Sequence, residues 1–289
     1  MPLLINADDF GLTPGVNRSV VELHRAGVLT SATLMATGAF FDDAAALAHA
    51  TPTLEVGCHV VLVNGLPALD PARIPSLCPD GRCFRPMLGR FAVDLHLGRV
   101  RAAEIEAEAA AQIRRLQHAG LRVSHVDTHK HTHLFPRVLR PLLQAARACG
   151  VPAIRNPFEP AWAVRATAGA SALRRLQIAF LGRRRGAFER QVQQAGLFAT
   201  AGTLGVLATG TPDVAGALRS LLSALPAGAE TWELVCHPGY PDEHLDRVAT
   251  RLRTSRAQEH AALLEQIPRA GVKLGTWRDL SGTAPAPPA

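Results

Sequence analysis

The sequence predicts an α/β protein folded as an irregular (β/α) barrel with seven or eight parallel strands. Two observations lead to this fold class. Short apolar runs alternate with helical segments about seven or eight times along the chain, a pattern typical of parallel α/β architectures. Polar side chains also recur at the ends of the apolar runs, and the carboxyl ends of barrel strands meet on one face. An open, doubly wound sheet usually gathers only two or three such ends.

The first third of the chain supplies three of the expected strands. An apolar run at residues 3–7 ends in Asp8 and Asp9, and further strands are expected at 31–36 and at 54–62, where the strand carries His59. Thr13 and Pro14 are typical of a helix start, and this helix should reach residue 27. A short helix is expected at 42–49. Residues 64–98 are rich in Pro and Gly and lack periodicity, and loops of this length are usually functional.

The remaining two thirds continue the alternation, with an ambiguous basic and apolar segment at 158–200. We expect strands at 123–127, 151–156, 204–208, 233–236 and 272–274. We expect helices at 101–119, 136–149, 213–225 and 245–266. Composition does not shift along the chain, so residues 1–280 are predicted to be a single domain, followed by a disordered Pro- and Ala-rich tail at 281–289.

Composition argues against several classes of protein. The net charge of +7 comes with only one basic run, Arg183 to Arg185, and with 5% aromatic residues, so nucleic-acid binding is not expected. Five widely spaced cysteines are typical of reduced thiols in the cytoplasm. The chain enters its first strand without a basic leader, so no signal peptide is expected. No apolar run approaches the roughly 20 residues that a spanning helix needs.

Asp8 and Asp9 are the first candidates for a catalytic site. Neighbouring residues of a strand point to opposite faces, but both can reach one cavity where the chain turns at a strand end. Two adjacent carboxylates resist joint ionisation unless a cation lies beside them. A division of labour is therefore expected, with one carboxylate binding a metal ion and the other acting as a base. The alternative is a surface turn, which Asp-Asp-x-Gly also fits.

Histidines provide the second set of candidates. Residues 125–133 read His-Val-Asp-Thr-His-Lys-His-Thr-His, four histidines within nine residues. One metal ligand with supporting partners is the economical interpretation, because metal-bound imidazoles need an orienting acceptor, a role that suits Asp127. The spacing alone does not choose the ligating histidine. His59 on its own is more typical of a buried core histidine, and gains weight only if the barrel places it beside Asp9.

Two later positions complete the candidate site. Arg155 follows a predicted strand and could hold an ionised aspartate by a two-pronged contact. His237, which precedes Pro-Gly, could act as a general acid. Each also fits a structural role, a surface ion pair or a turn histidine. The chain has neither a nucleotide-binding glycine motif nor a serine or cysteine nucleophile motif, which leaves metal-assisted hydrolysis as the predicted class.

These residues lie in four motifs that carry a family resemblance. The motifs are Asn-Ala-Asp-Asp-Phe-Gly at 6–11, Gly-Cys-His-Val-Val-Leu at 57–62, the histidine segment at 125–133 and Cys-His-Pro-Gly-Tyr at 236–240. Together they closely resemble the YdjC-type carbohydrate deacetylases, a family of the glycoside hydrolase/deacetylase barrel type, from residue 3 to about residue 280. Within that family the chain is similar to the hopanoid-biosynthesis-associated branch, HpnK.

The resemblance implies roles for individual residues. Asp9, His59 and His129 would bind one divalent metal ion, Mg²⁺, with Zn²⁺ or another divalent ion as the alternative. Asp8 would be the catalytic base, with Arg155 fixing it and His237 as the general acid. His125, Asp127 and His133 would support the ligands or contact the substrate. The family usually has Asp-Ser-His-His-His-Val-His where this chain has Lys130 in place of the second histidine, so its substrate contacts are expected to differ.

The implied reaction is hydrolysis of the N-acetyl group of an amino sugar or glycolipid, with an N-acetylglucosaminyl hopanoid as the substrate of the HpnK branch. A homodimer in the cytoplasm, peripheral to the inner membrane, is expected. Apolar and basic residues alternate at 162–188, as in an interfacial helix, although a packed helix or a dimer face fits as well. A metal-dependent phosphoesterase and a non-catalytic sugar-binding protein remain as alternative functions.

Overall fold

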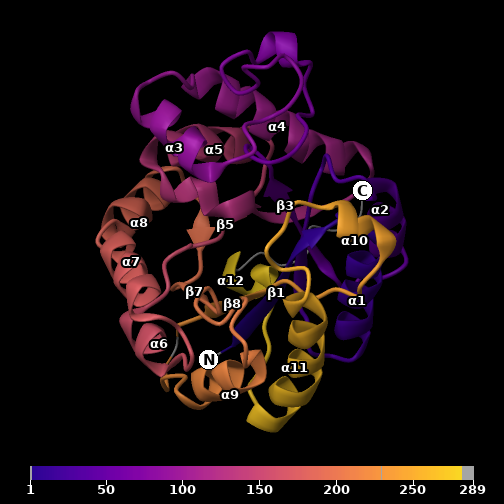
Figure 1. The fold of residues 1–289 in the computed structure, drawn as a ribbon, viewed down its shortest axis with the longest axis vertical. Coiled ribbons are helices and arrows are strands. Elements are labelled where there is room, and N and C mark those ends of the chain that lie inside the picture. Colours follow the sequence, from indigo (N-terminus) through magenta and orange to yellow (C-terminus); the bar gives the residue numbers. More distant parts are fainter. Residues whose placement is uncertain (1, 229, 282–289) are drawn as a thin grey trace.

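The computed structural model describes residues 2–228 and 230–281. Eight parallel strands form one curled sheet in the order β6-β5-β4-β3-β2-β1-β8-β7, with helices around it (Figure 1). The irregular (β/α) barrel predicted from the sequence is thus confirmed. The strands are β1 (Leu3–Phe10), β2 (Ser31–Leu34), β3 (Glu55–Val60), β4 (Val123–Thr128), β5 (Ala153–Ile154), β6 (Phe198–Ala199), β7 (Thr203–Leu204) and β8 (Trp232–Cys236).

The helices fall between the strands, as the alternation of the sequence predicted. The α-helices are α1 (Pro14–Arg25), α2 (Phe41–His49), α3 (Leu88–His96), α4 (Ala102–His118), α5 (Pro136–Ala148), α6 (Ala161–Ala166), α7 (Ala172–Gly182), α8 (Arg185–Gln194), α9 (Val214–Ser223), α10 (Glu243–Arg247), α11 (Ser255–Ala270) and α12 (Trp277–Ser281). Two 3₁₀ helices are η1 (Pro71–Arg73) and η2 (His129–Leu134). At the start of α1, the Thr13 hydroxyl accepts the Val16 N–H at 3.3 Å, so the predicted cap is confirmed.

β1 lies in the interior of the sheet, between β2 and β8. All of its residues are buried, which is expected for a parallel strand covered on both faces. Its pairing with β8 joins the two ends of the sequence in one sheet. Ala7 lies beside Cys236, and His59 of β3 lies beside Asp127 of β4. Because the strands are parallel, the residues that follow these pairs converge at one edge.

Three predicted elements at the carboxyl-terminal end are wrong in their bounds. The strand expected at 204–208 ends at Leu204, because the Glu159 carboxylate accepts the next free N–H groups, those of Gly205 and Leu207, both at 3.0 Å. The strand expected at 272–274 is a single bridge from Leu3 to Leu274. The helix expected at 245–266 is divided into α10 and α11.

Two other segments hold more helix than the sequence indicated. The loop expected at 64–98 contains η1 and α3, and α3 buries Phe91 and Leu95 against the core. The ambiguous segment at 158–200 forms three helices, α6 to α8, and the short strand β6. The disordered tail predicted at 281–289 lies outside the described residues beyond Ser281. None of the helices in the described ranges is both long and apolar enough to cross a bilayer.

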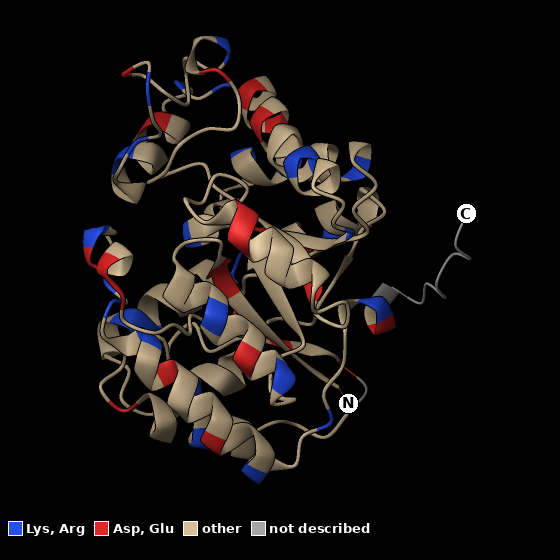
Figure 2. Ribbon diagram, turned by 90° about the vertical axis from the view of Figure 1, so that its right-hand side faces the viewer, with Lys and Arg blue, Asp and Glu red and all other residues tan. Residues whose placement is uncertain are grey.

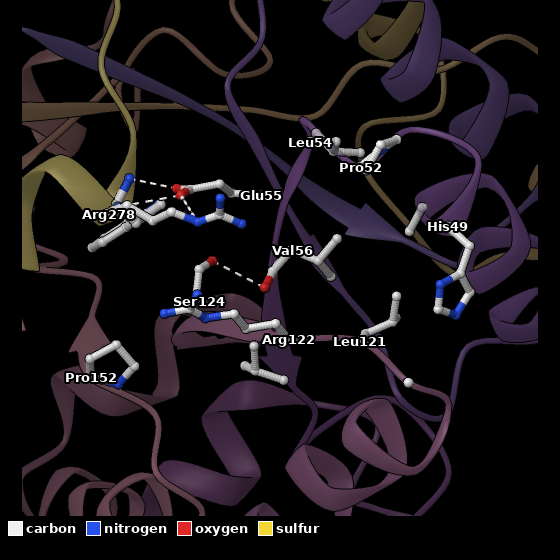
Figure 3. A pocket seen from close by; sticks show the side chains of 14 residues that line it. His49, Pro52, Leu54, Glu55, Val56, Leu121, Arg122, Ser124, Pro152 and Arg278 are labelled. Atoms are coloured by element: carbon white, nitrogen blue, oxygen red, sulfur yellow. Dashed lines mark hydrogen bonds and ion pairs between the residues drawn. The ribbon is translucent and has the colours of Figure 1, made fainter. Parts of the chain in front are cut away.

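Charged residues are interspersed over the outer helices, with basic and acidic segments side by side (Figure 2). One polar hollow, of roughly 210 Å³, lies at the amino-terminal end of the sheet (Figure 3). Its carboxylate, Glu55, accepts the N–H groups of Trp277 at 2.6 Å and Arg278 at 3.3 Å and pairs with the Arg278 side chain at 3.2 Å. Glu55 therefore attaches α12 to the base of the barrel, at the start of β3 rather than beside His59 at its end.

Candidate metal centre

Asp8 and Asp9 lie at the end of β1 and have separate partners. Asp9 has a φ of 65°, a left-handed conformation that non-glycine residues rarely adopt. This turn interrupts the strand alternation, and the pairing with β2 is irregular between Ala7 and Phe10. Both carboxylates are buried. Asp8 pairs with Arg155 and Asp9 pairs with Arg256, so the two acids are ionised beside two different cations.

Three potential metal-ligating atoms converge beside Asp9. Its Oδ1 lies 3.5 Å from His59 Nε2 and 3.4 Å from His129 Nδ1, and the two imidazole nitrogens are 3.3 Å apart. Ligands bound about 2.0–2.2 Å from one ion lie roughly 3.0–3.5 Å from each other, which matches these separations. Asp9 Oδ1 is buried and has no hydrogen-bond partner in the described chain. This donor set therefore fits a divalent metal ion.

The Asp127 carboxylate orients one imidazole of this group, that of His59. His59 Nδ1 lies 2.8 Å from Asp127 Oδ1, an acceptor of the kind that metal-bound histidines use. Burial lowers the pKa of His59, but the Asp127 and Asp8 carboxylates outweigh it and raise the pKa to about 9. Burial lowers the pKa of His129. A metal ion would therefore displace a proton from His59 and find His129 already neutral at pH 7.

A second group of potential ligands, Asp8, His59 and Asp127, also lies within 4.8 Å. Its carboxylates already have a cation, because the buried Arg155 guanidinium donates to Asp8 Oδ2 at 2.8 Å and Oδ1 at 2.7 Å and pairs with Asp127 Oδ2. The same guanidinium donates to Glu233 at 2.8 Å. The group with free ligand atoms is thus the one at Asp9.

Arg155 sets the charge of Asp8. Burial alone would raise the pKa of the Asp8 carboxyl, but the Arg155 guanidinium outweighs it and holds the pKa well below its usual range. His237, directly after β8, places Nε2 3.7 Å from Asp8 Oδ2. The His237 backbone N–H donates to Glu259 Oε2 at 2.6 Å, which anchors the β8 end to α11. The arrangement places an ionised carboxylate and an imidazole close to the three ligand atoms.

The other histidines of the 125–133 segment lie around this centre. Lys130 and His131 have positive φ values of 55° and 50°, so the chain turns sharply after His129. The His133 ring bonds Thr128 Oγ1 at 2.6 Å, and burial lowers the pKa of His131 to about 3. His125 lies earlier in β4, where its ring stacks on Trp277 at 4.0 Å. His133 thus braces the loop, and His125 packs against α12.

The structure brings together seven of the predicted site residues. They are Asp8, Asp9, His59, Asp127, His129, Arg155 and His237. Sequence reasoning missed three others, Glu233, Arg256 and Glu259. The inward alternation of β8 could have indicated Glu233, and the i, i+3 spacing of Arg256 and Glu259 could have indicated one shared helix face.

Comparison with known proteins shows which family the chain belongs to. The model of the family described as YdjC-like protein matches residues 2–273. The chain belongs to the YdjC-like family. The family resemblance that the four motifs indicated is thereby confirmed.

Two named relatives and one solved structure extend the comparison. A carbohydrate deacetylase of Brevibacillus brevis is 44% identical over 159 residues, which are 55% of this chain and only 60% of that protein. A chitooligosaccharide deacetylase of Klebsiella pneumoniae is 30% identical over 96% of this chain and 98% of that protein. A crystal structure from Enterococcus faecalis, of a protein named for cellobiose-phosphate cleavage, superposes with a TM-score of 0.73 and 25% identity, covering 96% of this chain and 98% of that one.

Proposed function

We propose that this protein is a metal-dependent deacetylase that hydrolyses the N-acetyl group of an amino sugar. The observation that carries the proposal is the convergence of Asp9 Oδ1, His59 Nε2 and His129 Nδ1 beside the ionised Asp8. The names of the two YdjC-like relatives, a carbohydrate deacetylase and a chitooligosaccharide deacetylase, support the same reaction.

Asp9, His59 and His129 would hold the ion. A divalent metal ion supplies a Lewis acid that polarises a carbonyl and makes water more acidic. The family resemblance implies Mg²⁺, whereas two imidazoles beside one carboxylate are donors that suit Zn²⁺. Elemental analysis of protein purified without chelator distinguishes the two, and one ion per chain is expected.

Asp8 and His237 divide the proton transfers. The water oxygen attacks the acetamide carbon while Asp8 takes a proton from that water. Arg155 holds the Asp8 carboxylate ionised and in place. His237 gives a proton to the sugar nitrogen as the carbon–nitrogen bond breaks, which yields acetate and the free amine. Each general acid–base step typically contributes about 10²–10⁴-fold to the rate.

The test is acetate release from N-acetylglucosamine, its oligomers and an N-acetylglucosaminyl lipid. We expect release from at least one substrate, loss of release with EDTA and recovery when the metal is restored. A metal-loaded protein that releases no acetate from any of them refutes the proposal. A phosphoesterase has less support, because Arg155 already engages the carboxylates that a second metal ion would need. Release of acetate from any of these substrates would exclude the alternative that the protein only binds sugars.

The proposed substrate is an N-acetylglucosaminyl hopanoid, presented at the inner membrane to a cytoplasmic homodimer. One feature of α7 supports membrane contact. Leu173, Leu176 and Phe180 are 67%, 67% and 59% exposed and lie on one helix face. Arg183, which follows the helix, lies over the Phe180 ring. By contrast, Arg174 and Arg175 donate to backbone carbonyl groups and belong to the packing of α7.

Liposome sedimentation tests this contact. We expect the protein to bind vesicles that contain anionic phospholipid and to lose binding when Leu173 and Leu176 are both replaced by Asp. Vesicles that never bind the unmodified protein exclude membrane contact through α7. Light scattering on the eluting protein measures whether it is a dimer.

A further inference from the structure

An apolar hollow of roughly 480 Å³ lies next to the proposed metal centre. Two of its lining residues, Lys130 and His131, directly follow the proposed ligand His129 in the chain. The hollow therefore adjoins the proposed metal centre at the segment that follows His129. Its volume falls in the range of about 300–1,000 Å³ that is typical of small-molecule sites.

The walls of the hollow come from three separate elements. Leu88 and Leu95 belong to α3, Leu134 and Phe135 lie at the junction of η2 and α5, and Leu181 belongs to α7. Leu95 is buried and the other four are half-buried. A sugar ring presents hydroxyl groups that such walls cannot bond, so this surface suits an aliphatic group.

Charge also limits what the hollow can accept. Its charged lining residues, Lys130, Arg137 and Arg184, are all basic, and its described lining contains no Asp or Glu. Arg137 donates to the Leu95 carbonyl at 3.0 Å and so ties α5 to α3. A cationic occupant would meet only like charge, whereas a neutral aliphatic group would replace water along the leucine walls.

We propose that this hollow binds an aliphatic aglycone attached to the N-acetylated amino sugar of the substrate. The inference rests on the proposed function, because the sugar must present its acetyl group at Asp8 and Asp9 while the aglycone extends past Lys130 and His131. Binding in the hollow then selects alkyl-linked amino sugars over free sugars and their oligomers.

The test compares octyl and methyl β-N-acetylglucosaminide, both kept below the concentration at which the octyl compound forms micelles. Titration calorimetry on the intact protein measures binding, and acetate release measures turnover. Burying methylene groups should make the octyl compound bind at least about tenfold more tightly than the methyl compound, with a matching rise in kcat/KM. Equal affinity for the two compounds overturns the proposal.

A pair of substitutions on α3 locates the effect. Ala92 lines the hollow, whereas its neighbour Val93 is exposed and does not. Ala92→Phe fills the space and should abolish the octyl preference, while Val93→Phe should keep it. Leu181→Ala changes the hollow from α7 instead and should reduce the octyl preference. It thereby shows that the loss in Ala92→Phe does not come from a disturbance confined to α3. A preference that survives both Ala92→Phe and Leu181→Ala overturns the assignment.

The two readouts separate this inference from the proposed function. An octyl preference in calorimetry supports the hollow as an apolar binding site even if neither compound releases acetate, and the deacetylase is refuted only if the oligomers and the N-acetylglucosaminyl lipid also release none. Acetate release without any octyl preference refutes the hollow and leaves the deacetylase intact.

Discussion

Arg256 of α11 donates from Nη2 to Oδ2 of Asp9 at 2.5 Å, although 247 positions of sequence separate the two residues. The pair is buried on both sides, with side-chain exposures of 1% and 5%. The contact engages one carboxylate oxygen and leaves Oδ1 directed at His59 and His129. Arg256 therefore acts as a positioning residue for the ligand whose backbone is in the left-handed region.

Replacing Arg256 should weaken metal binding more than it weakens folding. We expect Arg256→Lys to lower metal affinity by about 10–100-fold, as is usual when a group that supports a ligand is changed. Calorimetric titration of metal into the apo-protein measures the effect. Arg269→Lys, at an exposed arginine of the same helix that pairs with Glu265, is the matched control. Unchanged affinity in Arg256→Lys would contradict the positioning role.

Asp8→Asn should separate catalysis from metal binding. The substitution keeps the shape of the side chain but removes the proton acceptor, so kcat should fall by about a hundredfold or more. Metal stoichiometry should stay at the unmodified value, because the proposed ligands are Asp9, His59 and His129. Near-normal turnover with metal retained would remove Asp8 from the role of base.

Arg155→Lys should change the pH dependence of the reaction. Burial favours the protonated Asp8, and Arg155 opposes it by holding the pKa of this carboxyl well below its usual range. A lysine offers one point charge in place of the two-pronged contact, so the pKa of Asp8 should rise. Activity requires the ionised form and falls as pH drops through this pKa, so the acid limb of kcat/KM should move to higher pH. An acid limb that stays in place in a folded variant would show that Arg155 does not control Asp8.

The strand ends of the site could be predicted from the sequence because each apolar run stops at a polar residue. Asp8, Asp127 and His237 follow this rule, whereas His59 lies within its apolar run, and parallel pairing then brings the four together. Helix α3 was not predicted, because the sequence around it is rich in proline and glycine and its first residue has no side-chain cap before it. The contacts of its buried Phe91 and Leu95 with the core are tertiary and leave little local signal.

Arg256 escaped prediction for a related reason. The pattern at 245–266 fits one continuous helix, but Arg253 donates to the carbonyl groups of Leu245, Asp246 and Val248 at the end of α10. These contacts, which reach back five to eight positions along the chain, stabilise the end of α10 before α11 begins at Ser255. The break determines which face of α11 meets Asp9. Helical periodicity cannot encode such a break, so the partner of Asp9 could be found only in the folded chain.

Gly57→Ala should destabilise the barrel beneath the metal centre. A Cβ at this position of β3 would lie 2.5–2.7 Å from three atoms of the His125 ring. That ring cannot yield easily, because it stacks on Trp277 at 4.0 Å and its Nδ1 lies 2.9 Å from Ser124 Oγ. Overpacking of this kind costs about 1–3 kcal/mol, and urea unfolding monitored by circular dichroism measures it.

Gly89→Ala is the matched control for this substitution. Gly89 lies in α3, where an added Cβ would meet no atom within 4 Å. Alanine is favoured over glycine in a helix by roughly 0.5–1 kcal/mol, so this variant should be as stable as the unmodified protein or more so. Equal stability of the Gly57→Ala and Gly89→Ala variants would show that the His125 ring can move aside, and that its stacking on Trp277 does not fix the base of the site.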